Sequence, residues 1–213
     1  MNEENILKAL QAARESKKRN FKQSIDLMLS FKGLDMKKAE HKIKAEVMLP
    51  HLPRMEKIGL MVDNLIPKAQ KLENVRVIRK EEIEGLARDK KSAKKLANEC
   101  AGFIAEAPLM PLIGKSLGPV LSPRNMMPAP VPANLEDLKG AVEKRMKIVR
   151  VQIRDSPTIQ LRIGTEEMDD KKVAENARAA IDAVIAALPK NEENMKKIVI
   201  KTTMGKPVKV ELK

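Results

Sequence analysis

The chain has 213 residues, a formal net charge of +13 and 43% apolar residues. This length allows one domain or two small ones, and the charge favours a polyanionic partner, with nucleic acid ahead of an anionic membrane surface. No segment approaches the ~20 apolar residues of a membrane span, and no signal peptide is visible, so no membrane partner is expected. The single cysteine, Cys100, excludes an internal disulfide and is compatible with a reducing compartment.

The first third of the chain predicts one helix followed by short strands. Ile6, Leu10 and Ala13 recur at helical spacing, which predicts a helix ending at about residue 18. Apolar and polar residues then alternate over residues 25–31, as in a half-buried strand. Two further apolar runs predict strands at 43–49 and 58–62.

After Pro67 the pattern changes to short apolar strands that alternate with helices. Strands are predicted at 75–78 and 103–105, and between them a helix at 81–98 that breaks near Gly85 or Asp89. This alternation is typical of a parallel α/β unit.

A proline-rich stretch, residues 107–132, follows and holds seven of the thirteen prolines. Proline fixes φ and removes a donor, so neither a long helix nor a central strand is expected after Ile113. The stretch is also rich in leucine and methionine, unlike a disordered linker. We therefore expect a packed, irregular crossing, followed by a helix at about 135–146.

The last third returns to half-buried strands around one long helix. Alternation predicts strands at 148–154 and 159–163, and Asp169-Asp170 caps an apolar helical stripe that Pro189 ends. A strand is predicted at 198–200 that continues into Thr202-Thr203-Met204-Gly205, and a last one at 208–212.

The sequence offers weak support for nucleotide chemistry. Gly114-Lys115-Ser116 suggests a phosphate-binding loop, but Leu109 stands where that motif needs its first glycine. Gly118-Pro119 is then expected to stop the helix that should follow. These two departures from the motif disfavour the phosphate-loop interpretation.

No residues stand at the spacing of a catalytic or metal site. His41 and His51 lack partners at ligand spacing and are expected at the surface, and Cys100 is expected as a small residue at a helix end. The acid pairs Glu166-Glu167 and Glu192-Glu193 flank helix ends, where capping or solvation explains them. We expect no enzyme, no cofactor and no metal.

Two segments are candidates for contact with RNA. The first is a basic run that ends beside Phe21 and comprises Arg14, Lys17, Lys18, Arg19 and Lys22. A solvated helix end explains its charges equally well. The second is Thr202-Thr203-Met204-Gly205, which also reads as a β-branched strand ending in a glycine turn. In the functional interpretation Thr203 suits a ribose 2′-hydroxyl, Met204 offers a flexible contact, and Gly205 allows close approach.

Three motifs in the proline-rich stretch resemble the family of the large-subunit ribosomal protein L-one, in its archaeal type. They are Gly114-Lys115-Ser116-Leu117-Gly118-Pro119, Ser122-Pro123-Arg124 and Met127-Pro128. The resemblance covers nearly the whole chain. It implies that both chain ends form a split β-α-β terminal domain, residues 1–66 with 155–213, and that residues 67–154 form an inserted Rossmann-like α/β domain.

The resemblance also implies a function and a site. Members of this family bind the ribosomal RNA of the mobile stalk beside the tRNA exit site and repress translation by binding their own mRNA. We therefore expect a cytoplasmic, ribosome-associated protein, monomeric when free, with transient tRNA contact. The RNA-binding residues implied are Arg19, Phe21, Lys22, Ser24, Gln160, Arg162, Gly164, Lys201, Thr203, Met204 and Gly205.

Two alternatives remain at this point: a DNA-binding regulator with a ligand-sensing middle domain, and a nucleotide-binding enzyme. Net charge alone favours a different part of the chain for nucleic-acid binding from the part that the resemblance implies. The block 67–154 carries 18 basic and 10 acidic residues, the largest excess in the chain, whereas the implied specific site lies in the terminal domain. Phosphate contacts add affinity and shape contacts specify, so both can hold.

Overall fold

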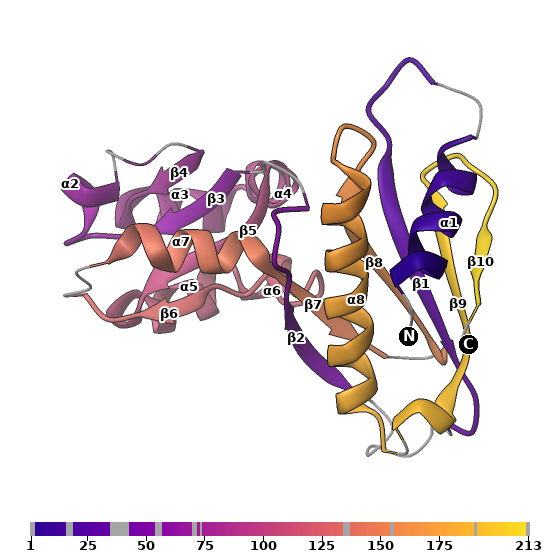
Figure 1. Ribbon diagram of the computed structural model, residues 1–213. Coiled ribbons are helices and arrows are strands. Elements are labelled where there is room, and N and C mark those ends of the chain that lie inside the picture. Colours follow the sequence, from indigo (N-terminus) through magenta and orange to yellow (C-terminus); the bar gives the residue numbers. More distant parts are fainter. Residues whose placement is uncertain are drawn as a thin grey trace. The chain divides into compact units, whose positions relative to one another are not determined.

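The computed structural model of the chain describes residues 3–15, 19–34, 43–53, 57–69, 72, 74–133, 137–153, 156–189 and 191–211. The chain separates into two compact units (Figure 1). Unit 1 comprises Met1–Arg54 and Lys147–Lys213, and unit 2 comprises Met55–Met146. The predicted fold class, α+β with α/β, is confirmed, because unit 1 is built on an antiparallel sheet and unit 2 on a parallel one.

Unit 1 is a four-stranded antiparallel sheet with two long helices. The strand order is β10-β9-β1-β8. Its elements are α1 (Glu3–Arg14), β1 (Ser24–Phe31), β2 (Lys44–Met48), β7 (Ile148–Gln152), β8 (Thr158–Thr165), α8 (Asp170–Ala187), the 3-10 helix η3 (Asn191–Asn194), β9 (Met195–Thr202) and β10 (Val208–Val210). Figure 1 shows α1 and α8 beside this sheet, and α1 packs against α8, β9 and β10.

The alternation in β1 decides which face of the sheet the helices cover. Ile25, Leu27, Leu29 and Phe31 are buried and share one hydrophobic core with the apolar stripes of α1 and α8. Successive strand residues point to opposite faces, so the polar residues of β1 lie on the other, open face. The predicted strand and the predicted long helix are both confirmed here, but Asp169, at the N-cap position of α8, makes no capping hydrogen bond with its side chain.

Strands β2 and β7 form a separate antiparallel ribbon, with Lys44 opposite Gln152 and Met48 opposite Ile148. Val47 and Val151 bury their side chains in the core of unit 1. The ribbon therefore belongs to unit 1, although the predicted boundary had placed residues 148–154 in the inserted domain.

Unit 2 is a parallel sheet with strand order β4-β3-β5-β6 and helices between its strands. Its elements are β3 (Lys57–Met61), α2 (Ile66–Ala69), β4 (Val75–Ile78), α3 (Lys80–Arg88), α4 (Lys90–Glu99), β5 (Cys100–Glu106), the 3-10 helix η2 (Ala107–Leu109), α5 (Met110–Ser116), α6 (Gly118–Leu121), β6 (Ala129–Val131) and α7 (Leu138–Lys147). The predicted boundary at 66/67 is wrong because it cuts off β3, a central strand of this sheet.

The predicted break in the long helix occurs at Asp89. Its carboxylate accepts from the Lys91 amide at 2.9 Å and from the Ser92 hydroxyl at 2.6 Å, which caps α4. These two hydrogen bonds favour the ionised form and hold the pKa of Asp89 below its usual value.

The proline-rich stretch is more regular than predicted. It contains η2, α5, α6 and strand β6, where an irregular crossing had been expected. Pro108, Pro111 and Pro119 stand in the first turns of η2, α5 and α6, where a missing N–H removes no helical hydrogen bond. A helix does end here, because α5 stops at Ser116, but Gly118-Pro119 also begins the short helix α6, which had not been expected.

Candidate nucleic-acid interface

Ser24, the first residue of β1, and Thr203, which follows β9, extend the sheet beyond its regular ladder. The Thr203 amide donates to the Ser24 carbonyl at 3.0 Å, and the Ser24 amide donates to the Thr203 hydroxyl at 3.1 Å. The two hydroxyl oxygens lie 3.0 Å apart. The two predicted RNA-binding segments are therefore joined directly.

Gln23 links these segments to a third, although it was not predicted as a site residue. Its side chain is 1% exposed. The amide oxygen accepts from the Met204 amide at 3.0 Å, and the amide nitrogen donates to a Glu166 carboxylate oxygen at 2.7 Å. The Glu166 amide returns a hydrogen bond to the Gln23 carbonyl at 3.0 Å. Glu166 thus belongs to a part-buried hydrogen-bond network, a role that the sequence, which suggested capping or solvation, did not predict.

Arg14 of α1 holds the turn that carries Glu166. Its guanidinium donates to the carbonyls of Glu166, at 2.7 Å, and Met168, and its Nε lies 2.8 Å from the Asp170 carboxylate. The sequence had grouped Arg14 with cations available to a partner. The structure instead uses this side chain inside the protein, while Lys17 and Lys18 of the same run lie outside the described residues.

The outer side of this junction carries two large apolar side chains. Phe21 is 51% exposed and Met204 is 59% exposed. Arg19 and Lys22 are exposed on the same segment as Phe21, and Lys22 pairs with Glu167 at 2.8 Å. Large apolar groups held in water beside cations suit an amphipathic polyanion such as RNA.

The open face of the sheet brings together three more of the predicted residues. Arg162 of β8 and Lys201 of β9 both stand opposite Asp26 of β1, one on each side. Gln160 stands opposite Met28 one pair further along. The register thus places Gln160, Arg162 and Lys201 on the side away from the helices.

The two predicted glycines lie in different surroundings: Gly164 is in a packed strand and Gly205 is in a turn. Gly164 is buried, and a Cβ there would lie 2.9 Å from Val173 Cγ2 of α8, so packing explains this glycine. Gly205 lies in the turn after β9, where its amide donates to the Thr202 carbonyl at 3.1 Å.

The residues weighed for catalysis have structural partners. Cys100 is buried at the junction of α4 and β5, and its desolvation, with Glu99 nearby, raises the pKa of the thiol, which disfavours the reactive thiolate. His51 Nε2 lies 2.6 Å from Glu175, and its backbone is held by Asn176. His41 lies outside the described residues.

Metal ions and membranes are two further kinds of partner to consider for the described part of the chain. Within it, no three His, Cys, Asp or Glu side chains gather as a metal ion requires. None of its helices is long and apolar enough to cross a membrane.

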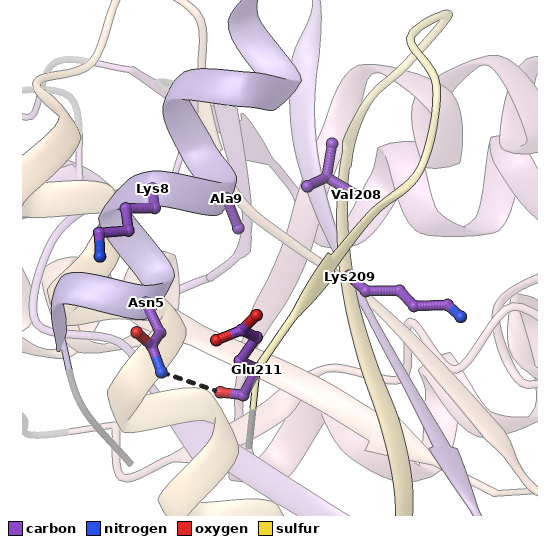
Figure 2. Close-up of a pocket in the computed structure, with 6 residues that line it drawn as sticks. All are labelled: Asn5, Lys8, Ala9, Val208, Lys209 and Glu211. Atoms are coloured by element: carbon purple, nitrogen blue, oxygen red, sulfur yellow. Dashed lines mark hydrogen bonds between the residues drawn. The ribbon is translucent and has the colours of Figure 1, made fainter. Parts of the chain in front are cut away.

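A pocket of about 280 Å³ lies between α1 and β10 (Figure 2). Asn5 closes one side by donating to the Glu211 carbonyl at 3.3 Å. Figure 2 shows Lys8 and Lys209 pointing apart, so their charges do not converge on one ligand position. We therefore place the candidate interface at the Ser24–Thr203 junction and not at this pocket.

Comparison with known proteins gives the same assignment over nearly the whole chain. Residues 12–206 match the family described as "Ribosomal protein L1p/L10e family". The chain is 45% identical to the large ribosomal subunit protein uL1 of Thermococcus kodakarensis, covering 94% of each chain. It is 43% identical to the uL1 of Methanothermococcus thermolithotrophicus, covering 99% of this chain and all of the relative. It is 40% identical to the uL1 of Pyrococcus horikoshii, covering 97% of this chain and 95% of the relative.

These relatives are archaeal and carry the name of a ribosomal protein, which is a non-enzymatic family, so the protein is not an enzyme. The predicted resemblance and its archaeal type are confirmed. The chain belongs to the ribosomal protein L1p/L10e family.

Proposed function

We propose that this protein is a cytoplasmic constituent of the large ribosomal subunit that binds the ribosomal RNA of the mobile stalk beside the tRNA exit site. The binding surface, called here the junction surface, surrounds the contact between Ser24 and Thr203. It comprises Arg19, Phe21, Lys22, Ser24, Gln160, Arg162, Lys201, Thr203, Met204 and Gly205. The observation that carries the proposal is the exposure of Phe21 and Met204, which stand on two segments joined by hydrogen bonds.

The distribution of charge supports this placement once the structural limits of the units are used. Unit 1 holds 26 basic and 17 acidic residues, and unit 2 holds 16 and 12. The larger excess therefore lies in the unit with the junction surface. The apparent excess of the middle block came from a boundary that assigned Lys147, Arg150 and Arg154 to it.

The hydroxyl groups at the junction have different tasks in this proposal. The Thr203 hydroxyl accepts from the Ser24 amide and lies 3.3 Å from the Ser24 carbonyl, so its hydrogen-bonding capacity is used within the protein. Among the described residues, the Ser24 hydroxyl lies within hydrogen-bond distance of Thr203 Oγ1, and a hydroxyl can take part in three hydrogen bonds. Ser24 is therefore the better candidate to bind a ribose 2′-hydroxyl, with Thr203 holding it in place.

The apolar residues set the mode of binding. Folds that read bases by stacking present two or three aromatic side chains on a sheet, and Phe21 is the one aromatic on the junction surface. Recognition would then rest on RNA shape, 2′-hydroxyl groups and apolar contact with riboses. A surface that reads shape can serve two RNAs of the same local fold, which fits repression through the protein's own mRNA.

The direct test is the affinity of the whole protein for a stalk fragment of ribosomal RNA and for duplex DNA of equal length. We expect much tighter binding to the RNA, with log affinity falling linearly against log salt as counterions are released. Equal affinity for the two nucleic acids at moderate salt would reject the proposal and favour the DNA-binding alternative. Sedimentation with large ribosomal subunits, and competition by an mRNA leader and by tRNA, then separate the partners.

A further inference from the structure

The parallel sheet of unit 2 has a topological switch point, a position where many folds of its class bind a ligand. Strands β3 and β5 are neighbours at its centre, and the chain continues from β3 to β4 on one side and from β5 to β6 on the other. In open α/β sheets, ligands bind outside the carboxyl ends of the strands at such a switch point. Phosphate groups are commonly held there by backbone N–H groups.

In this protein a side chain of the chain itself stands at the switch point. Glu106, the last residue of β5, has no exposed surface. Its Oε1 accepts from the amides of Asp63, at 3.0 Å, and Leu65, at 2.9 Å, in the loop that follows β3. Its Oε2 is buried and has no hydrogen-bond partner among the described residues.

Burying a whole carboxylate to accept from two amides costs free energy, because its second oxygen has no hydrogen-bond partner among the described residues. Glutamate is almost never fully buried unless it is paired, and a neutral acceptor would serve the same two donors. The loop itself, Val62-Asp63-Asn64-Leu65, has no glycine, whereas dinucleotide-binding sheets use glycines there so that a pyrophosphate can approach the backbone. The group that accepts from these two amides is therefore a side chain of the chain itself.

We propose that Glu106 is a built-in anion that occupies the phosphate position of the inserted unit and so closes this unit to nucleotides. The amides of Asp63 and Leu65 form the receptor, and the Glu106 carboxylate replaces an external phosphate. Removing the carboxylate then leaves an anion site at those two amides. This inference concerns unit 2 alone and does not depend on RNA binding by unit 1.

The test follows the backbone amide signals of Asp63 and Leu65 by NMR in the whole protein during titration with inorganic phosphate. In Glu106→Ala we expect saturable shifts at these two amides, and in the parent protein no response to phosphate or to a nucleoside diphosphate. Ile83→Ala is the control, because it also empties a fully buried site in unit 2 but removes no charge. Silent amides in Glu106→Ala, or responsive ones in the parent, would overturn the proposal.

Melting temperatures keep the test decisive if Glu106→Ala folds poorly. Phosphate stabilises most proteins by exclusion from their surfaces, so Ile83→Ala and the parent measure that general effect. Phosphate is compared with chloride at equal ionic strength. We expect it to raise the melting temperature or the folded fraction of Glu106→Ala by clearly more than this general effect. A gain no larger than that of Ile83→Ala would reject the anion site.

Discussion

The Ser24 amide donates to the Thr203 hydroxyl at 3.1 Å, across 179 positions of sequence. This hydrogen bond allows substitutions to distinguish a residue that holds the site together from a residue that contacts RNA. Thr203→Val keeps the shape but leaves the part-buried Ser24 amide without its acceptor, so it should cost about 1–3 kcal/mol of stability and weaken RNA binding. Ser24→Ala keeps that amide and should weaken binding with a smaller loss of stability.

Denaturant unfolding and dissociation constants at fixed salt measure both effects. Thr203→Ser, which restores the hydroxyl, should recover most of the stability. If Thr203→Val were as stable as the parent and bound RNA as well, the contact between the two segments would have no role in the site.

Phe21 and Met204 give a second test, in which stability should not change. Both side chains are more than half exposed, so truncation to alanine removes little buried area. We expect each truncation to weaken binding to the stalk fragment by roughly tenfold or more, a loss of about 1.4 kcal/mol. Met48→Ala is the matched control, because Met48 is 55% exposed in the same unit but lies on the β2–β7 ribbon. Equal losses in all three variants would show that no specific surface is involved.

Local periodicity predicted most elements of the fold but not which strands pair. The alternation in β1 and the stripe of α8 are contained in about ten to twenty residues, so each was found. The domain boundaries were misplaced because the apolar pattern of a strand does not show which other strand it pairs with. Strand β3 pairs with β4 and β5, and β7 pairs with β2 about a hundred positions away.

The exposed residues of the candidate site were predicted from the sequence, but the residues that hold them in place were missed. Gln23 and Glu166 meet across 143 positions, which no spacing reveals. One signal was available, because Gln23 falls in phase with the buried residues Ile25 and Leu27 of the alternation. A polar residue at a buried phase indicates a required hydrogen-bond partner.

The structural boundaries predict how unit 1 can be isolated. A chain that joins residues 1–54 to 147–213 keeps β2 with β7, and the Leu49 amide already bonds the Lys147 carbonyl at 2.9 Å, so a short glycine linker should suffice. We expect this chain to fold and to prefer stalk RNA over DNA. A chain cut at 66 and 155 should fold poorly, because it exposes β3 and leaves β2 without its partner. Circular dichroism and RNA binding compare the two, and better folding of the second would contradict the boundaries.

The outer face of α4 predicts a weak electrostatic contribution from unit 2. Lys91, Lys94 and Lys95 are exposed on this helix, whereas its Ala93, Leu96 and Ala97 are buried. Phosphate contacts add affinity without sequence preference, so Lys94→Gln with Lys95→Gln should lower affinity for RNA and DNA alike. The slope of log affinity against log salt should fall by up to about two units.

The control for this pair removes the same charge elsewhere in unit 2. Lys139→Gln with Lys144→Gln changes two exposed lysines of α7, which packs in a different hydrophobic cluster from α4. A slope change of the same size in both double variants would mean that net charge, and not the α4 face, is responsible.

Two glycines of unit 2 should respond in opposite directions to alanine. Gly59 of β3 is buried, and a Cβ there would meet the ring of Phe103, its neighbour on β5, which has no exposed surface. Neither the strand nor the ring can yield freely in a packed core, so Gly59→Ala should destabilise unit 2 by about 1–3 kcal/mol. Gly85 of α3 has open space where a Cβ would stand, so Gly85→Ala should stabilise this unit by up to about 1 kcal/mol.

The effects should appear in the unfolding of unit 2 and not in RNA binding by unit 1. The two units have separate cores and need not unfold in one step, so calorimetry is preferred to a single denaturation midpoint. Gly59→Ala should lower the temperature of one unfolding transition, and Gly85→Ala should raise the temperature of the same transition. Affinity for the stalk fragment should stay nearly the same in both variants, because unit 2 contributes only the weak contacts of α4. Stability unchanged in Gly59→Ala would mean that Phe103 can adopt another packing. A large loss of specific RNA binding in that variant would place part of the recognition surface on unit 2.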